Sequence, residues 1–341
     1  MGTLTTTAFQ RRAIPLDLSD VFYVMRADLE RVEQRLREEA NVDYPIVGEI
    51  VDNLIGAGGK RLRPLLLLLA AKPFDYDLDE LIPAAAGVEL LHNASLIHDD
   101  TVDHADVRRG QPTLNSLLPP ETVILLGDYL FARSAMLAAA TMNPRVVGVF
   151  ASTLAKICDG QLSEVFAAHQ TEQTIDDYKR RIYGKTASLF AGSAEMGAII
   201  GQAPGDQIEA MSQFGGDVGM AFQIIDDVLD LRESTDAIGK PAGLDLRQGT
   251  VTLPTMLFFE RNTMNGHYAE LISRVIDGNE ISDSDYNDAV QVIRESGALE
   301  ASIEVAEEYV EHARNILRGL PPGEATDMLE ALAMESLSRT H

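Results

Sequence analysis

Residues 94–103 read ASLIHDDTVD and residues 221–230 read AFQIIDDVLD, so the pattern Asp-Asp-x-x-Asp follows an apolar run twice. On a helix, residues i and i+4 lie on one face, one turn apart. The pairs stacked in this way are Asp99 with Asp103 and Asp226 with Asp230. Like charges at this spacing oppose helix formation unless a cation neutralises them. The two copies therefore predict two facing helices that hold divalent cations, and carboxylate ligands favour Mg²⁺ shared with substrate phosphates. The alternative, two solvated acidic helix ends, explains one copy as well but not two copies of identical spacing.

The composition is that of an ordinary globular protein and excludes several function classes. The 341 residues are 45% hydrophobic and 24% charged, with a formal net charge of −25. A nucleic-acid surface needs a basic face, so no nucleic-acid partner is expected. The single cysteine, Cys158, excludes an internal disulfide framework and fits a reducing, cytoplasmic location. No apolar stretch approaches the roughly 20 residues that span a bilayer, so the sequence predicts no transmembrane segment.

Apolar residues recur with a period of 3.6 along most of the chain, which predicts an all-α fold. Residues 1–16 lack this period and are expected to form a flexible N-terminal arm. Residues 17–341 show no linker and predict a single domain. The helices expected within it include about 21–39, 81–102 and 299–317, a capped helix from 174 to 183, and a second acidic helix beginning after Gly216.

Basic residues cluster at two turns beside the predicted helices. Residues 56–64 read GAGGKRLRP and precede a leucine-rich helix. A glycine turn at a helix N-terminus exposes backbone N–H groups and the positive end of the helix dipole, which together bind anions. The cations that add donors there are Lys60, Arg61 and Arg63, and those of the second turn are Arg108 and Arg109. We interpret the first turn as a diphosphate site; the alternative is a basic helix cap.

The helix of the first motif presents further side chains to the same cavity. At about 100° per residue, His92 and Ser95 share the face of Asp99 and Asp103, with Leu91 further round. The small Ser95 leaves room beneath the acidic residues. A single helical histidine is also typical of a purely structural role, so both interpretations of His92 stay open.

Polar residues from later segments are expected to complete the cavity. Gly184 interrupts a helical pattern and predicts a kink that turns Lys185 and Thr186 inward, although a surface lysine fits the sequence equally well. Gln223 shares the cavity face of the second acidic helix. Lys240 lies in a long polar loop that is a candidate lid over the site.

The predicted cavity combines six carboxylates, several cations and an apolar interior, but no nucleophile–base pair. A site that binds phosphates through metal without a nucleophile suggests that diphosphate is itself the leaving group. Metal coordination stabilises the charge on the departing diphosphate. The carbon left behind is a cation, which persists only in a dry, apolar pocket.

These motifs, in this order from about residue 48 to 254, resemble those of the trans-isoprenyl diphosphate synthases. The segments that carry the resemblance are 58–64, 96–110, 184–186 and 222–230. The resemblance implies an all-α isoprenoid-synthase helical bundle around a central apolar cavity, usually homodimeric. It implies that three Mg²⁺ join both acidic motifs to an allylic diphosphate, which ionises and is attacked by isopentenyl diphosphate.

The resemblance also implies a role for each matching residue. The expected contacts of isopentenyl diphosphate are Lys60, Arg63, His92 and Arg109. Those of the allylic diphosphate are Arg108, Lys185, Thr186, Gln223 and Lys240. The expected direct metal ligands are Asp99, Asp103 and Asp226, supported by Asp100, Asp227 and Asp230. The residues expected to act in catalysis are Asp99, Asp103, Asp226, Lys185 and Arg108.

Product length depends on the residues beneath the first motif. In the resembling family, a bulky aromatic residue five positions before this motif gives short products, whereas this chain has Ala94 followed by Ser95. With Leu91, these residues predict an open pocket and an all-trans product of about C30–C50. Phe131 or another large residue deeper in the pocket would instead give a C15 or C20 product. One departure is Thr250, where many relatives carry a lysine, and it leaves the charge of the lid open.

Two rival functions remain on the sequence alone. A class I terpene cyclase shares the fold and the ionisation, but typically has a different second metal motif and lacks the basic glycine turn. A non-catalytic subunit of a two-component synthase usually has degraded acidic motifs, and neither motif is degraded here.

Overall fold

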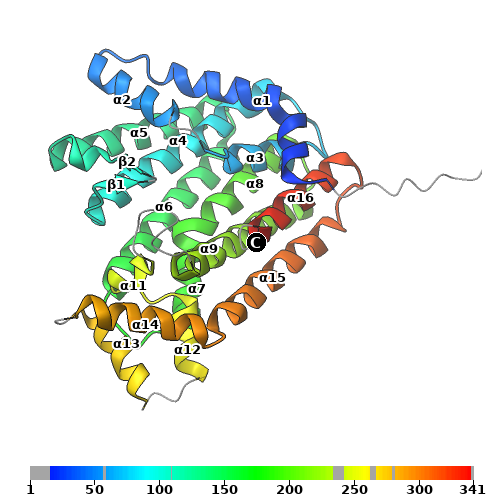
Figure 1. Ribbon diagram of the computed structural model, residues 1–341. Helices are drawn as coiled ribbons and strands as arrows, with labels where there is room; N and C mark the ends of the chain where they lie inside the picture. Colours follow the sequence, from blue (N-terminus) through cyan, green and yellow to red (C-terminus); the bar gives the residue numbers. More distant parts are fainter. Residues whose placement is uncertain are drawn as a thin grey trace, which may run out of the picture.

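The computed structural model describes residues 16–56, 59–108, 110–232, 242–261, 266–278 and 281–338, and it is a bundle of helices (Figure 1). The elements, in order, are α1 (Leu18–Glu38), α2 (Pro45–Gly56), α3 (Leu62–Ala71), α4 (Leu78–Val102), β1 (Val107–Arg108), β2 (Gln111–Pro112), η1 (Leu114–Ser116), α5 (Pro120–Ala140), α6 (Pro144–Ala167), α7 (Ile175–Ile182), η2 (Tyr183–Ala187), α8 (Ser188–Ile200), α9 (Gly205–Arg232), α11 (Leu244–Arg247), α12 (Leu253–Arg261), α13 (His267–Asp277), α14 (Asp283–Glu295), α15 (Ala298–Leu317) and α16 (Glu324–Ser338). The all-α prediction is confirmed. The predicted N-terminal arm, except for Leu16, lies outside the described residues.

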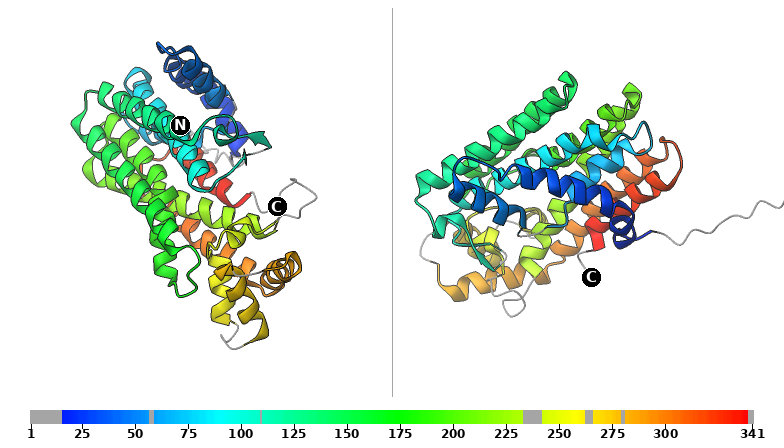
Figure 2. Two further views of the ribbon diagram at one scale, coloured as in Figure 1. Left: turned by 90° about the vertical axis from the view of Figure 1, so that its left-hand side faces the viewer. Right: turned by 90° about the horizontal axis from the view of Figure 1, so that it is seen from above.

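Helix α8 forms the centre of the bundle. Every residue of α8 except Glu195 is buried, and the helix packs against α3, α4, α6 and α9. Helices α12, α13 and α14 gather at one end of the molecule in all three views (Figures 1 and 2). A helix buried on all sides needs apolar or small residues throughout, as in the sequence SLFAGSAEMGAII of α8.

The second acidic helix is longer than predicted. Helix α9 begins at Gly205, so Gly215 and Gly216 lie inside it rather than before it. A Cβ atom on Gly215 would lie 2.5 Å from the carbonyl oxygen of Phe190 in α8. Gly215 therefore serves close backbone packing of α8 against α9, which a single sequence does not distinguish from a turn.

The prediction that no stretch reaches membrane-spanning length was wrong. Among the described residues, α5 is long and apolar enough to cross a bilayer by length and composition. Within the structure α5 packs along α4, and it carries the charged residues Glu121, Asp128 and Arg133. A core helix of a bundle has the same composition, so this criterion alone does not assign α5 to a membrane.

Candidate active site

A cavity of about 410 Å³ brings the two acidic motifs together. Asp103 reaches it from the C-terminal end of α4, and Gln223 and Asp227 reach it from α9. The other polar residues that line it come from α6, α7, η2, the residues that follow α4 and α6, and the segment after residue 241; they are His104, Gln161, Glu164, His169, Tyr178, Arg181, Lys185, Thr186, Asp245, Gln248, Thr250 and Thr252. The predicted inward orientation of Lys185, Thr186 and Gln223 is confirmed by this lining.

The first motif places the carboxylates of Asp99 and Asp103 where their charge is unfavourable. Both residues lie at the C-terminal end of α4, where the helix dipole disfavours anions. Burial raises the pKa of Asp99 to about 6, although the nearby Lys185 opposes this shift. Burial also raises the pKa of Asp103. A bound cation would relieve both costs, so this donor set fits Mg²⁺.

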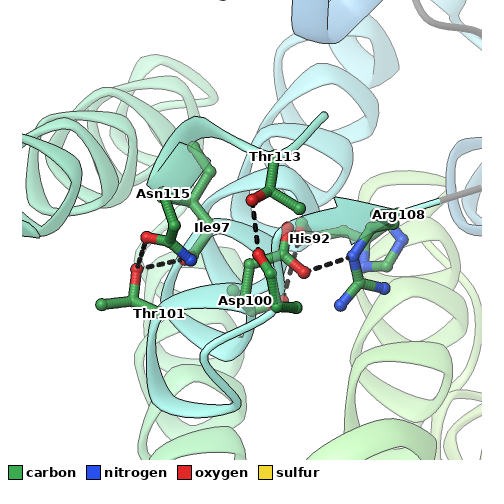
Figure 3. A network of polar contacts seen from close by, with 9 residues as sticks. His92, Ile97, Asp100, Thr101, Arg108, Thr113 and Asn115 are labelled. Atoms are coloured by element: carbon green, nitrogen blue, oxygen red, sulfur yellow. Dashed lines mark hydrogen bonds and ion pairs between the residues drawn. The ribbon is translucent and has the colours of Figure 1, made fainter. Parts of the chain in front are cut away.

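The middle residue of the first motif has a different partner. Oδ1 of Asp100 accepts a hydrogen bond of 2.7 Å from Nε of Arg108, which lies on the β1–β2 hairpin (Figure 3). Thr113 ties the hairpin to the end of α4, because its hydroxyl donates to the carbonyl oxygen of Ala105. Asp100 thus positions Arg108 beside the cavity, where its charge acts on Asp99 and Asp103.

The second motif divides its carboxylates between the cavity and the loop that follows. Asp227 is buried and accepts hydrogen bonds from the hydroxyl of Tyr178 at 2.7 Å and from Nε2 of Gln223 at 2.8 Å. Burial nevertheless raises the pKa of Asp227 to about 7. Asp230 accepts the backbone N–H groups of Leu244 and Asp245, both at 3.1 Å, so it holds the start of α11. Asp226, the first residue of the motif, is half-buried on α9.

A π-helical turn aims Lys185 at the first motif. The predicted kink at Gly184 is this turn, η2, which widens the helix between α7 and α8. Gly160 of α6 fits against it so closely that a Cβ there would lie 2.2 Å from the backbone nitrogen of Lys185. Lys185 forms an ion pair with Glu164 of α6. Burial disfavours its charge, but Glu164 and Asp99 outweigh burial, so the pKa of Lys185 is raised.

The basic turn before α3 contains one buried cation, Arg61, and one exposed cation, Lys60. Arg61 is buried, with Nη1 2.7 Å from Oε1 of Glu89, and it also donates to the carbonyl oxygen of Ile55. Our sequence-based grouping of Arg61 with the anion donors was therefore wrong, since its guanidinium is buried and donates to Glu33, Glu89 and Ile55. The guanidinium carbon of Arg63 lies 4.7 Å from the ring centroid of Phe190. Lys60 is exposed and pairs with Glu335.

The other predicted residues lie outside the lining of the 410 Å³ cavity. His92 is half-buried on α4; Ala94 and Leu91 are fully buried; and the hydroxyl of Ser95 donates to the carbonyl oxygen of His92. Phe131 packs edge-on against His98, with ring centroids 5.1 Å apart. The predicted roles of Arg109 and Lys240 fall on residues outside those described.

Sequence reasoning missed several residues of the cavity. Among them are Gln161, Glu164, Tyr178 and Asp245. Within the described structure, neither side-chain polar atom of Gln161 has a hydrogen-bond partner, so its amide is available to a ligand. Gln161 and Glu164 are three residues apart on α6, a spacing that places them on one helix face and that the sequence does contain.

Within the described ranges, no three histidine, cysteine, aspartate or glutamate side chains form a ready-made metal cluster. Of the six carboxylates of the two motifs, Asp103 and Asp227 line the 410 Å³ cavity, whereas Asp99, Asp100, Asp226 and Asp230 lie outside its lining. Mg²⁺ keeps several waters and is commonly completed by substrate phosphates, so an incomplete protein ligand set is typical of such sites.

Comparison with known proteins decides the family. The polyprenyl synthetase family model matches residues 44–293. The chain belongs to this family. It is 37% identical over 319 residues to heptaprenyl diphosphate synthase component 2 of Geobacillus stearothermophilus, covering 94% of this chain and 98% of the relative.

Two crystal structures are similar to this polyprenyl synthetase along nearly the whole chain. A decaprenyl diphosphate synthase from Rhodobacter capsulatus superposes with a TM-score of 0.89 and 37% identity, covering 95% of this chain and 99% of the other. A polyprenyl synthase from Caulobacter crescentus, complexed with calcium and isoprenyl diphosphate, has a TM-score of 0.89 and 33% identity, covering 95% and 98%. The isoprenoid-synthase bundle expected from the motifs is thereby confirmed.

Proposed function

We propose that this protein joins isopentenyl diphosphate head-to-tail to an allylic diphosphate and repeats the reaction to build an all-trans polyprenyl diphosphate of about C30–C50. The observation that carries the proposal is the cavity that is lined by Asp103 of the first motif, Asp227 of the second and Lys185. Family membership and the prenyl synthases among its relatives support the same reaction class.

The acidic motifs and their basic neighbours would bind the allylic substrate. Asp99, Asp103 and Asp226 would hold three Mg²⁺ ions. These ions would neutralise charge on the departing diphosphate. Lys185 and Arg108, both beside the first motif, would stabilise that diphosphate as the carbon–oxygen bond breaks. The remaining residues proposed for this substrate are Thr186, Gln223 and Lys240, with Asp100, Asp227 and Asp230 supporting the ligands.

The second substrate would bind at the basic turn before α3. Lys60, Arg63, His92 and Arg109 are the residues proposed to hold isopentenyl diphosphate. Its double bond would attack the allylic cation, one carbon–carbon bond would form, and a proton would then leave, most simply to the released diphosphate. The described lining of the cavity contains no serine or cysteine, which agrees with a reaction in which carbon, not protein, captures the cation.

An apolar surface on neighbouring helices supports a homodimer. Leu125 and Met136 of α5, and Leu162 and Phe166 of α6, are all more than half exposed. These helices are consecutive and pack against each other at the edge of the bundle (Figure 1). Large apolar side chains exposed on neighbouring helices are typical of an interface, so we propose that a second copy covers α5 and α6, and that the protein is cytoplasmic.

A partner of a different kind is the second candidate. The name of the Geobacillus relative designates it as one component of a heptaprenyl diphosphate synthase, and this chain covers 98% of that relative. A requirement for another polypeptide would appear as a purified chain that binds substrates but turns over only after the partner is added.

Incubation of the purified chain with Mg²⁺, isopentenyl diphosphate and each of geranyl, farnesyl and geranylgeranyl diphosphate tests the proposal. Products are dephosphorylated and sized by mass spectrometry. A ladder ending at C30 or longer is expected. A clean stop at C15 or C20 would support a short-chain synthase instead. Cyclic hydrocarbon made from the allylic substrate alone, with isopentenyl diphosphate unused, would indicate a terpene cyclase and overturn the proposal.

A further inference from the structure

The last described helix contacts the basic turn at the other end of the chain. Nζ of Lys60 lies 2.5 Å from Oε1 of Glu335, which is 275 residues away in sequence. Helix α16 packs against α1 and α3, which brings its final turn beside the residues that precede α3 (Figure 1). The contact therefore depends on tertiary packing and has no local sequence signature.

The glutamate is the more firmly held member of this pair. Its Oε2 accepts a hydrogen bond of 2.8 Å from the hydroxyl of Ser338, which also donates to the carbonyl oxygen of Glu335 at 3.0 Å. The Glu335 side chain is 19% exposed, against 56% for Lys60. A fixed carboxylate thus holds a flexible, solvated lysine.

The neighbouring cation of the turn is committed elsewhere. Arg61 points into the protein and pairs with Glu89, so its charge does not reach the surface of the turn. An anion that approaches Lys60 must draw it from Glu335 or bind with that carboxylate a few ångströms away. Either case costs free energy, because two anions then share one ammonium.

We propose that Glu335 competes with the diphosphate group of isopentenyl diphosphate for Lys60 and thereby sets the affinity for this substrate. The inference rests on the proposed function, which gives Lys60 to isopentenyl diphosphate. Glu335 is a positioning residue here: it acts on the substrate only through Lys60. The C-terminal helix consequently tunes one of the two diphosphate sites and leaves the metal-dependent site unchanged.

Equilibrium titration with isopentenyl diphosphate tests the competition without requiring turnover. The full-length protein is compared with Glu335→Gln and with the matched control Glu330→Gln, which removes the same charge from the same helix but from a pair with Arg314. The dissociation constant is expected to fall about two- to fivefold in Glu335→Gln, the range covered by exposed ion pairs, and to stay unchanged in the control. An equal or larger dissociation constant in Glu335→Gln would overturn the inference.

A double-mutant cycle separates competition from a change in structure. In a Lys60→Gln background, Glu335→Gln is expected to have no effect on binding, because the lysine for which it competes is absent. Thermal melting of each variant verifies folding. An undiminished gain in affinity in the Lys60→Gln background would assign the effect to general electrostatics and overturn the inference.

Kinetics then distinguish this inference from the proposed function. With turnover, KM for isopentenyl diphosphate is expected to fall in Glu335→Gln while KM for the allylic diphosphate stays unchanged. A wild-type chain without turnover would contradict the proposed function alone, since the titration still decides whether Glu335 competes for Lys60. A wild-type chain that does not bind isopentenyl diphosphate at all would overturn both.

Discussion

The hydroxyl of Tyr178 lies 2.7 Å from Oδ2 of Asp227, so a residue of α7 supports the middle carboxylate of the second acidic motif. Burial and the nearby Asp227 keep the pKa of Tyr178 well above its ordinary value, which leaves the phenol protonated and able to donate. The hydrogen bond in turn stabilises the carboxylate form of Asp227 against burial. Tyr178 therefore supports a residue of the proposed metal site, although neither acidic motif contains it.

Tyr178→Phe is expected to weaken the response to metal. Removing the donor raises the pKa of Asp227 above about 7 and leaves a buried carboxylate with one fewer partner. Hydrogen bonds to charged groups contribute about 1.5–3 kcal/mol, so the Mg²⁺ concentration for half-maximal activity is expected to rise about tenfold or more. Mg²⁺ titration of the condensation rate measures this.

Tyr183→Phe is the matched control for that measurement. Tyr183 is half-buried and lines a different groove, with Asp217 and His312, on the other side of the π-helical turn. Its removal should leave the Mg²⁺ requirement unchanged. An equal shift in both variants would mean that the turn, rather than the hydrogen bond to Asp227, controls metal binding.

Asp99→Asn is expected to abolish turnover. Asp99 is a proposed direct ligand, and metal stabilisation of a leaving group is worth several kcal/mol, so kcat should fall by about 10³ or more. Asp226→Asn should behave alike from the opposite motif. Asp106→Asn, an exposed residue of neither motif, is the control and should retain the wild-type rate. Near-normal Mg²⁺-dependent rates in either ligand variant would contradict the metal assignment.

Metal binding is expected to be coupled to protons in a defined pH range. The pKa values of Asp99 and Asp227, about 6 and about 7, lie above the ordinary 3.8. Between about pH 4 and pH 7 the folded protein therefore binds more protons than the unfolded chain. Its stability without metal should decrease as pH rises through this range, and Mg²⁺ should reverse the loss at pH 7 and above. Urea unfolding at pH 5 and 7.5, with and without Mg²⁺, checks the sign; a metal-free protein more stable at pH 7.5 would contradict it.

The sequence predicted the site better than it predicted the packing around it. The repeated motif and the kink at Gly184 identified Asp103, Lys185, Thr186, Gln223 and Asp227, which line one cavity. These residues follow local rules of helical spacing, so a single chain reveals them.

What the sequence did not predict depends on contacts between distant segments. Arg61 looked like an anion donor because its partner, Glu89, is 28 residues away on another helix. Gly215 was interpreted as part of a turn, since the sequence does not show that it packs closely against Phe190 of α8. Asp245 lines the cavity, and its backbone N–H donates to Asp230, which lies 15 residues earlier in the chain. In each case the identity of the residue is local, whereas its role is set by packing.

Product length is expected to shorten when the residues beneath the first motif are enlarged. Ala94→Phe and Ser95→Phe place an aromatic ring where the sequence predicts the growing chain to pass. Ala94 is fully buried, so its replacement also overpacks the core by about 1–3 kcal/mol, whereas Ser95 is half-buried and should tolerate the change better. Mass spectrometry of the products is the measurement, with melting temperatures as a check on folding. An unchanged ladder in two folded variants would place the pocket elsewhere, with Phe131 the next residue to test.

Substitution of Lys60 is expected to weaken substrate binding, whereas substitution of Arg61 is expected to lower the stability of the fold. Arg61 and Glu89 are both buried, and breaking a buried ion pair by removing one partner costs about 3–5 kcal/mol. Arg61→Met should therefore lower the urea midpoint strongly, since Glu89 is left buried without its cation, and Glu89→Gln should recover part of that loss in the double variant. Lys60→Gln changes an exposed side chain and should leave the free energy of unfolding within about 1 kcal/mol of wild type. The same substitution should raise KM for isopentenyl diphosphate. A stable Arg61→Met protein with a selective loss of isopentenyl diphosphate binding would instead return Arg61 to the substrate site.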